Sequence, residues 1–262
     1  MSKLSVKELL AMKGERQLTQ VFVTTPEEAH ACEEAGIDLV IASERSDSPA
    51  IRAAAADTFL TIGLVFGDYS SADEAVRGGF RALRDGADAV YAGVGLGSVR
   101  AMANEGIPVV GHVGLVPHKR TWFGGLRPVG KTAAEAFEVY ERTQAYEAAG
   151  AIAVEMELVP HRIAAEISKR VSIVVLSMGS GTGCDGQYLF ATDILGANTG
   201  HVPRHAKVYR DFKAEYERLY GDSVAAFSEF RSDVESGAFP ADEHLVGVDE
   251  AEYEAFLERL SG

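Results

Sequence analysis

Short apolar runs alternate with segments of helical spacing along most of the chain. The runs have the length of buried strands, and in the segments between them apolar residues recur every three or four positions. Segment 132–150, for example, begins at Thr132, which can cap a helix, and ends at Gly150, which can stop one. Repeats of this kind predict parallel strands joined by crossover helices. The predicted strands cover residues 19–24, 38–42, 59–66, 88–91, 108–113, 151–157, 172–176 and 187–191.

Eight strand–helix units predict an α/β protein with a (β/α)8 TIM barrel. A doubly wound sheet is the alternative, but it often carries a GxGxxG loop after its first strand, and here that strand ends in Thr24-Thr25-Pro26. Because no linker-like or low-complexity stretch interrupts the chain, we expect one domain over residues 1–262. Beyond the barrel, the pattern predicts helices over residues 206–220 and 222–236 and an acidic amphipathic helix in the tail "DEAEYEAFLERL".

Composition narrows the classes of function. Hydrophobic residues make up 47% of the 262 residues, which is enough for a large core, and the formal net charge of −14 argues against a general nucleic-acid binder. The two cysteines, Cys32 and Cys184, lie too far apart in sequence for a CxxC metal site and form no disulfide framework. We therefore expect a cytoplasmic protein without a signal peptide, a membrane span or nucleic-acid binding.

Polar residues gather at the ends of the predicted strands. In a parallel barrel the active site lies at these C-terminal ends, so residues there are the candidates for chemistry. Glu155 and Glu157 stand two apart on one strand and share a face, so one pKa of the pair should rise, which suits a general acid/base. Ion pairs with arginines are the alternative. The further candidates are Ser43, Glu44, Arg45, Asp68, Tyr69, Tyr91, His112, Ser177 and Ser180.

Four ordered motifs in the later part of the chain resemble one enzyme family. They are "VVGHVGLVPHKRTWFGGLRPVGKT", "EAAGAIAVEMELVP", "GSGTGCDGQYLFATDILGANTGHVPRHAKVY" and "VESGAFPADEH". Together they resemble ketopantoate hydroxymethyltransferase, which adds a one-carbon unit to 2-oxoisovalerate. The resemblance covers residues 86–244 and implies a (β/α)8 barrel of the phosphoenolpyruvate mutase/isocitrate lyase superfamily that assembles into a homo-oligomer.

The resemblance also implies a chemistry. Family enzymes bind a 2-oxo acid to Mg²⁺, a glutamate removes the proton from the carbon next to the carbonyl, and the enolate attacks methylene-tetrahydrofolate. The family's catalytic glutamate falls on Glu157 and its strand-end histidine on His112, which would contact the substrate. Gly124 and Gly125 would belong to a mobile lid that excludes water when it closes.

The family's metal-binding acids are largely replaced. Ser43-Glu44-Arg45 stands where the family has Gly-Asp-Ser, and the two other acid positions fall on Gly63 and Gly93. Mg²⁺ normally needs one or two carboxylates besides the substrate, so Glu44 would be its one remaining ligand. We therefore expect no metal, or Mg²⁺ held weakly at Glu44, and methylene-tetrahydrofolate only if the family's transfer reaction is retained. Our hypothesis is that cationic and hydrogen-bonding groups such as Arg45 replace the metal.

The other candidates each have two interpretations. Tyr91 either donates a hydrogen bond to an enolate oxygen or fills space. Glu44 and Arg45 either bind the substrate carboxylate or are solvated charges, and Ser43, Glu155 and Ser180 complete the predicted substrate-binding set.

Three functions follow from these observations. The first is a hydroxymethyltransferase-like or aldolase-like enzyme that makes or breaks a C–C bond next to the carbonyl of a small 2-oxo acid, with Glu157 as general acid/base and His112 and Tyr91 as catalytic partners. The second is a metal-independent lyase, decarboxylase or hydrolase acting on another small carboxylate in specialised metabolism. The third is a barrel that binds a ligand without catalysis.

Overall fold

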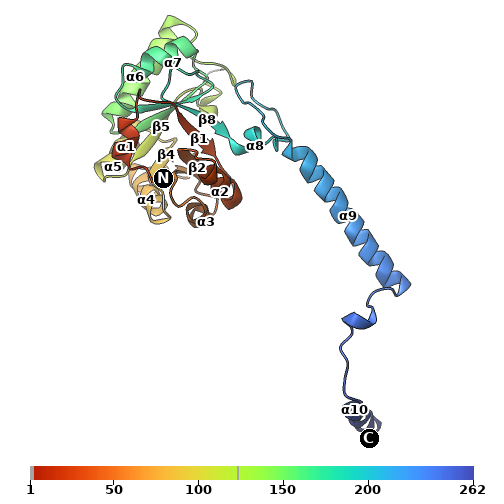
Figure 1. Ribbon diagram of the computed structural model, residues 1–262. Coiled ribbons are helices and arrows are strands. Elements are labelled where there is room, and N and C mark those ends of the chain that lie inside the picture. The colour runs from red at the N-terminus through yellow and green to blue at the C-terminus, as the bar shows by residue number, and fades with distance from the viewer. Residues whose placement is uncertain (1–2, 123) are drawn as a thin grey trace. The chain divides into compact units, whose positions relative to one another are not determined.

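The computed structural model describes residues 3–122 and 124–262 of the chain. The chain divides into two compact units, Met1–Arg210 and Asp211–Gly262, whereas the sequence suggested one domain over residues 1–262. The first unit is a closed barrel of eight parallel strands, β1 to β8 in chain order (Figure 1). The predicted (β/α)8 barrel is confirmed.

The strands form where the buried apolar runs predict them. Each predicted strand overlaps an observed one, and the ends differ by at most two residues. The observed strands are β1 (Leu18–Phe22), β2 (Leu39–Ser43), β3 (Phe59–Leu64), β4 (Ala89–Ala92), β5 (Val109–Gly114), β6 (Ala153–Glu157), β7 (Val174–Met178) and β8 (Gly186–Phe190).

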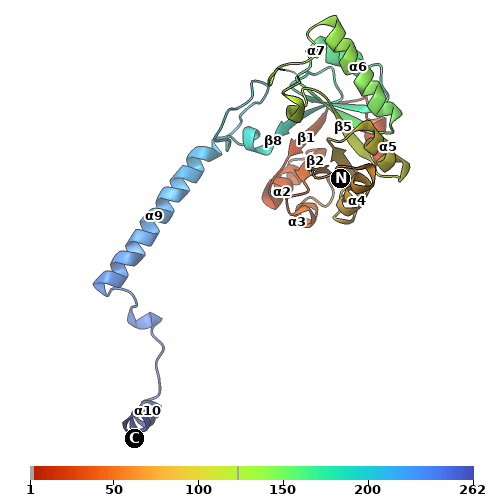
Figure 2. The same ribbon diagram turned by 180° about the vertical axis from the view of Figure 1, so that it is seen from behind.

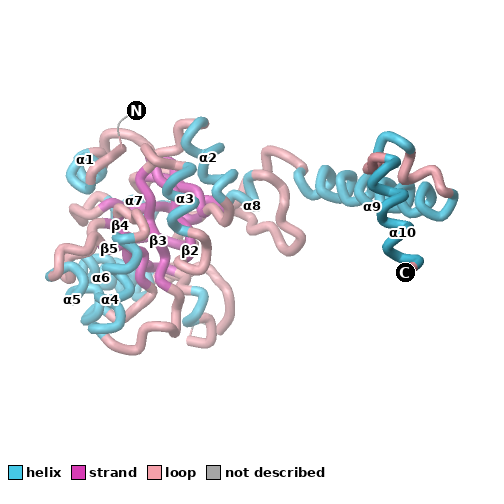
Figure 3. The backbone as a smooth tube through the Cα atoms, turned by 90° about the horizontal axis from the view of Figure 1, so that it is seen from below, coloured by secondary structure: helices cyan, strands magenta, loops and turns pink. Residues whose placement is uncertain are grey.

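Helices lie outside the strands and follow one another around the barrel (Figures 2 and 3). Their ends follow local signals: the Thr132 side chain accepts a hydrogen bond from the Glu135 amide, and Gly150 adopts a φ of 90° just after the helix. The helices of this unit are α1 (Val6–Ala11), α2 (Pro26–Glu34), α3 (Ser48–Ala54), α4 (Ala72–Arg84), α5 (Leu96–Asn104), α6 (Ala133–Ala148), α7 (His161–Ser168) and α8 (Ala191–Ile194), with a 3-10 turn at Pro117–Lys119.

Two apolar layers hold the barrel together. Outward-facing strand residues such as Val40, Leu60 and Val154 pack against the helices. Inside the barrel, residues near the strand starts, including Leu39 and Phe59, form a second cluster with other strands and with α1. This inner cluster fills the N-terminal end of the barrel and leaves the C-terminal end for polar side chains.

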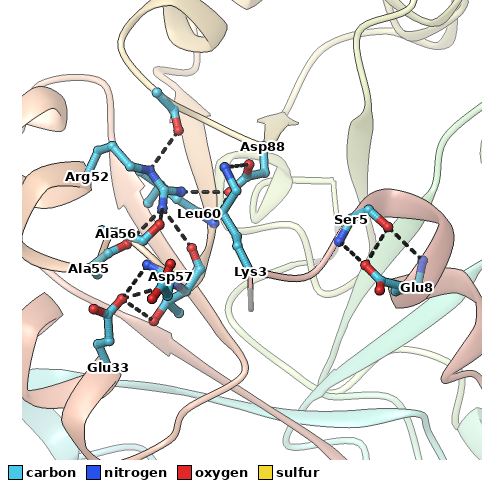
Figure 4. Close-up of polar contacts among 12 residues, drawn as sticks. Lys3, Ser5, Glu8, Glu33, Arg52, Ala55, Ala56, Asp57, Leu60 and Asp88 are labelled. Atoms are coloured by element: carbon cyan, nitrogen blue, oxygen red, sulfur yellow. Dashed lines mark hydrogen bonds and ion pairs between the residues drawn. The ribbon is translucent and has the colours of Figure 1, made fainter. Parts of the chain in front are cut away.

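A polar network ties the loops together at the N-terminal ends of the strands (Figure 4). Arg52 pairs with Asp88 at 2.7 Å and also donates to four backbone carbonyls. Asp88 in turn accepts from the Leu60 amide and pairs with Lys3. Because this network lies at the end of the barrel opposite the active-site end, we assign it to stability.

The second unit corrects one prediction. A single helix, α9 (Phe212–Ser236), replaces the two predicted over residues 206–220 and 222–236. Gly221, the residue between the two predicted helices, lies inside α9, and Arg218 pairs with Glu215 and Asp222 around it. One glycine costs a helix only about 1 kcal/mol, which such pairs and the long helix offset.

The tail helix predicted from the acidic amphipathic pattern is present. It is α10 (Glu250–Ser261), preceded by a 3-10 turn at Asp242–His244. In the part of the chain that the structure describes, no helix has the length and apolar character needed to cross a bilayer.

Candidate active site

A cavity of about 430 Å³ opens at the C-terminal ends of the strands. Its walls combine apolar side chains from β1, β2 and β8 with a polar group from β4, β5 and β6. Four of the predicted site residues belong to that polar group: Tyr91, His112, Glu155 and Glu157.

His112 is the centre of the polar group. Its Nδ1 lies 2.9 Å from the Tyr91 hydroxyl and 3.6 Å from the Glu155 carboxylate. Its Nε2 lies 2.9 Å from the Leu115 carbonyl and 3.2 Å from the Glu157 carboxylate. A carbonyl oxygen only accepts, so Nε2 carries a proton, and Nδ1 is the nitrogen that can exchange one.

Strand register brings these residues together. β5 and β6 pair so that His112 lies opposite Glu155 and Gly114 lies opposite Glu157. The two glutamates alternate with Met156 and therefore share the inner face, as their spacing predicts. The predicted cluster of Tyr91, His112, Glu155 and Glu157 is thus assembled in space, and its catalytic use stays a prediction.

Two groups of the cluster, Glu155 and His112, have raised pKa values. Burial raises the pKa of Glu155 to about 7, although His112 and a hydrogen bond from Gln20 act in the opposite direction. Burial would lower the pKa of His112, but its hydrogen bond to Glu157 and the charges of both glutamates raise it overall. The pKa of Glu155 therefore lies near neutral pH, which suits a group that exchanges a proton in acid–base catalysis.

Tyr91 is a hydrogen-bond donor in this setting. Burial, and then the negative charge of Glu155, raise the pKa of the Tyr91 hydroxyl well above its ordinary value. The hydroxyl therefore stays protonated at neutral pH and can donate to His112 or to an oxygen in the cavity.

The backbone around Glu157 is tightly fixed. Its carbonyl accepts from the Leu115 amide, and a Cβ added to Gly114 would lie 2.2 Å from that carbonyl oxygen. The next residue, Leu158, has a φ of 50°, a conformation that few non-glycine residues adopt. Such local strain persists only where surrounding contacts hold it, and it commonly occurs at functional sites.

Ser180 is hydrogen-bonded to the backbone on both sides of Glu157. Its fully buried hydroxyl accepts from the Val159 amide at 3.0 Å and donates to the Met156 carbonyl at 2.8 Å. It is not among the cavity-lining residues. The structure therefore gives Ser180 backbone partners, and its predicted contact with substrate stays a prediction.

The three residues at the end of β2 point in different directions. Ser43 lines the cavity. The Glu44 carboxylate accepts hydrogen bonds from the Val65 amide and the Tyr69 hydroxyl, and Arg45 is exposed and pairs with Asp68 at 3.1 Å. Neither Glu44 nor Arg45 is among the lining residues, so the structure does not bring them to the cluster around His112.

The residues at the strand ends do not fit the Mg²⁺ implied by the resemblance. Two of the three positions where the family has acids are Gly63 and Gly93, and the third is Glu44. Glu44 is already engaged by an amide and a hydroxyl. Within residues 3–122 and 124–262, no three His, Cys, Asp or Glu side chains are grouped so that they could hold a metal ion. Mg²⁺ requires several oxygen ligands in near-octahedral geometry, so we derive no step through a metal.

Three polar residues of the cavity wall were not predicted from the sequence: Tyr188 of β8, Asp193 and His205. Asp193 lies in α8, and His205 lies in the loop that follows it. Burial lowers the pKa of His205, against the attraction of Glu157 and Asp193. The stretch "TGHVPRH" contributed only to the family resemblance, although its second histidine, close behind the last strand, was a signal of its own.

The predicted lid follows β5. Gly124 and Gly125 adopt φ values of 71° and 127°, which only glycine adopts easily, and Trp122 is 88% exposed. Phe123 lies outside the described residues. Closure of the lid stays a prediction.

The barrel and the buried acid–imidazole cluster at its C-terminal end define a class of protein, a (β/α)8-barrel enzyme with a site suited to acid–base chemistry. The chain belongs to the ketopantoate hydroxymethyltransferase family, whose model matches residues 45–242. The resemblance read from the motifs is therefore confirmed, and a related transferase or lyase function at C–C bonds is supported over a barrel without catalysis.

Individual relatives cover most of the chain. A 3-methyl-2-oxobutanoate hydroxymethyltransferase of Hyperthermus butylicus is 34% identical and covers 98% of this chain and 95% of its own. The enzyme of that name from Thermotoga maritima is 32% identical and covers 92% and 96%.

Solved structures share the fold. A phosphonopyruvate hydrolase in complex with oxalate and Mg²⁺ has a TM-score of 0.53 at 16% identity and covers 100% of this chain and 97% of its own. A putative lyase/mutase from Burkholderia cenocepacia has a TM-score of 0.54 at 12% identity and covers 96% and 95%.

Proposed function

We propose that this enzyme makes or breaks a C–C bond next to the carbonyl of a small 2-oxo acid, with Glu157 as general acid/base. The observation that carries the proposal is the position of Glu157, which lines the cavity 3.2 Å from the imidazole of His112. The relatives are named for 3-methyl-2-oxobutanoate (2-oxoisovalerate), so this compound is the first substrate to test.

Each residue of the cluster has a part in this chemistry. Glu157 takes the proton from the carbon next to the carbonyl, and the electron pair of that C–H bond moves into the enolate. Tyr91 and His112 donate hydrogen bonds to the oxygen on which negative charge develops. The enolate carbon then attacks a one-carbon electrophile, which is methylene-tetrahydrofolate if the family's transfer reaction is retained. Glu155 exchanges protons with His112.

Deuterium exchange at C3 of 2-oxoisovalerate in D2O tests the first step without a one-carbon donor. We expect exchange by the wild-type enzyme and a loss of about 10²-fold or more in Glu157→Gln, because general-base catalysis contributes that much. Glu166→Gln is the matched control, since this glutamate is exposed on α7 and pairs with Arg170. Undiminished exchange in Glu157→Gln would contradict the proposal.

The second candidate is a metal-independent lyase, decarboxylase or hydrolase that acts on another small carboxylate. The poor metal ligand set at Glu44, Gly63 and Gly93 favours it. The exchange assay is therefore run with Mg²⁺ and with EDTA. Exchange that EDTA abolishes would refute our statement that the residues do not fit a metal, whereas no exchange together with turnover of another oxo or hydroxy acid would establish the second candidate.

We also propose that the enzyme is a homo-oligomer. One stripe of large apolar side chains runs along α9 at helical spacing and is left exposed by the rest of the second unit, which is typical of a helix that packs on a partner. The stripe consists of Tyr216, Tyr220, Val224, Phe227, Phe230 and Val234.

A further inference from the structure

The loop between α8 and α9 brings a histidine to the cavity. The Tyr209 amide donates to the Ile194 carbonyl, so the end of the loop is pinned to its beginning. A Cβ added to Gly196 would lie 2.0 Å from the Arg210 carbonyl oxygen, which shows how closely the two ends approach. Compact loops with adjoining ends are frequently functional. Pro203 and His205 of this loop line the same cavity as Glu157.

His205 is seated beside Glu157. A Cβ added to Gly179 would lie 2.8 Å from Cγ of His205 and 2.9 Å from Cδ2 of Leu158, so the imidazole packs directly over this glycine. Leu158 follows Glu157 at the end of β6, and Gly179 follows Met178, the residue that pairs with Glu157 in β7. The imidazole therefore lies over the strand ends from which Glu157 enters the cavity.

Asp193 provides a fixed negative charge near this histidine. It is buried, it lines the cavity, and the Asn198 side-chain amide donates to it at 2.7 Å. Burial nevertheless lowers the pKa of His205. The imidazole is therefore mainly neutral at neutral pH and able to accept a proton, while Asp193 and Glu157 stabilise the imidazolium that forms.

We propose that His205 is a second catalytic residue, which carries the proton of the substrate hydroxyl while Glu157 carries the proton of the carbon. In the cleavage direction, His205 takes the proton from the hydroxyl of the departing carbon, whose oxygen becomes a carbonyl. The C–C bond breaks, its electron pair forms the enolate, and Glu157 returns a proton to the enolate carbon. In the bond-forming direction, with formaldehyde as the electrophile, the same protons move in reverse. This inference rests on the proposed function.

Two reactions separate the two protons. Deuterium exchange at C3 of 2-oxoisovalerate needs only the carbon proton. Cleavage of 4-hydroxy-3,3-dimethyl-2-oxobutanoate to formaldehyde and 2-oxoisovalerate needs the hydroxyl proton as well. The variants are His205→Asn and His205→Phe, and His201→Asn is the matched control, because His201 is an exposed histidine of the same loop.

We expect both His205 variants to release formaldehyde about 10²-fold more slowly or worse, as for loss of a general base, while their exchange rate is unchanged. The control should match wild type in both reactions, and thermal unfolding should show that all variants are folded. Full formaldehyde release by the variants would overturn the inference, and so would an equal loss of exchange and release, which would mean that His205 only shapes the pocket. Wild-type exchange without cleavage would overturn it while leaving Glu157 as the base. Wild-type enzyme inactive in both reactions would overturn the proposed function and this inference together.

Discussion

Replacement of Glu155 by glutamine tests the buried cluster through stability. Glu155 is 3% exposed, and its carboxylate lies 3.6 Å from His112 and 3.2 Å from the Gln20 amide. Glutamine keeps the shape of the side chain and resembles the protonated acid, so the substitution removes the titration and little of the packing.

The expected magnitude follows from the pKa of Glu155, which burial raises from 4.5 to about 7. Between these values the folded protein binds a proton that the unfolded chain has released, so stability falls as the pH rises. At about 1.4 kcal/mol for each pH unit, the free energy of unfolding of the wild-type protein falls by about 3 kcal/mol across this range. The variant lacks this loss. The variant also removes the charge of Glu155, which helps to raise the pKa of His112. Because that raised pKa likewise makes the free energy of unfolding fall as the pH rises, its decrease in the variant changes stability in the same direction.

Urea unfolding of both proteins from about pH 5 to about pH 8 measures the effect. The free energy of unfolding of Glu155→Gln, minus that of wild type, should become more positive as the pH rises. Glu166→Gln is the control, because Arg170 and Lys169 lower the pKa of this exposed carboxylate, so any effect should have the opposite sign. A difference between Glu155→Gln and wild type that does not change with pH would refute the reasoning.

Three further predictions address stability, catalysis and assembly. Arg52→Lys should lower Tm by about 5–10 °C in a thermal melt, because about 2–3 kcal/mol of partly buried hydrogen bonds is lost. The control Arg170→Lys breaks only an exposed ion pair and should leave Tm unchanged. Equal melting temperatures for the two variants would contradict this prediction. Tyr91→Phe should slow deuterium exchange by about 10²-fold, as for removal of a hydrogen bond to an oxyanion, and a full rate would assign Tyr91 to filling space. Phe227→Asp should lower the molar mass measured by light scattering if α9 packs on a second copy, and an unchanged mass would rule out that role.

The barrel was predictable because its signals are local. Most strands are buried and largely apolar, and caps such as Thr132 and Gly150 bound the helices between them. The error at Gly221 has the same origin, since a glycine that breaks one helix is tolerated in another. Whether a glycine breaks a helix depends here on the length of α9 and on the charge pairs around Gly221.

The site residues could be predicted where the alternation of side chains between the two faces of a strand was applied. The period of two placed Glu155 and Glu157 on one face, and both line the cavity. The same rule puts Ser43 on the inner face with Ile41 and turns Glu44 away, towards the loop that carries Tyr69. Reading Ser43 and Glu44 as one charged strand end overlooked this alternation.

His205 could not be placed in this way, because its position depends on contacts distant in sequence. The loop after α8 is closed by a hydrogen bond between Tyr209 and Ile194, and the imidazole packs on Gly179 from β7. No periodicity along residues 195–210 encodes either contact. Packing in three dimensions, rather than local pattern, brings this side chain to the cavity.

The kind of residue that balances a buried carboxylate distinguishes a structural ion pair from a pair suited to acid–base catalysis. An arginine partner would have kept Glu155 ionised, because arginine does not release its proton. The structure instead gives Glu155 the imidazole of His112 and the neutral amide of Gln20, and it gives Glu157 the other side of the same imidazole. The negative charge is thus balanced by a proton that can move. Such a cluster costs stability as the pH rises from about 4.5 to about 7, as the raised pKa of Glu155 implies, and acid–base catalysis is a physical reason to keep it.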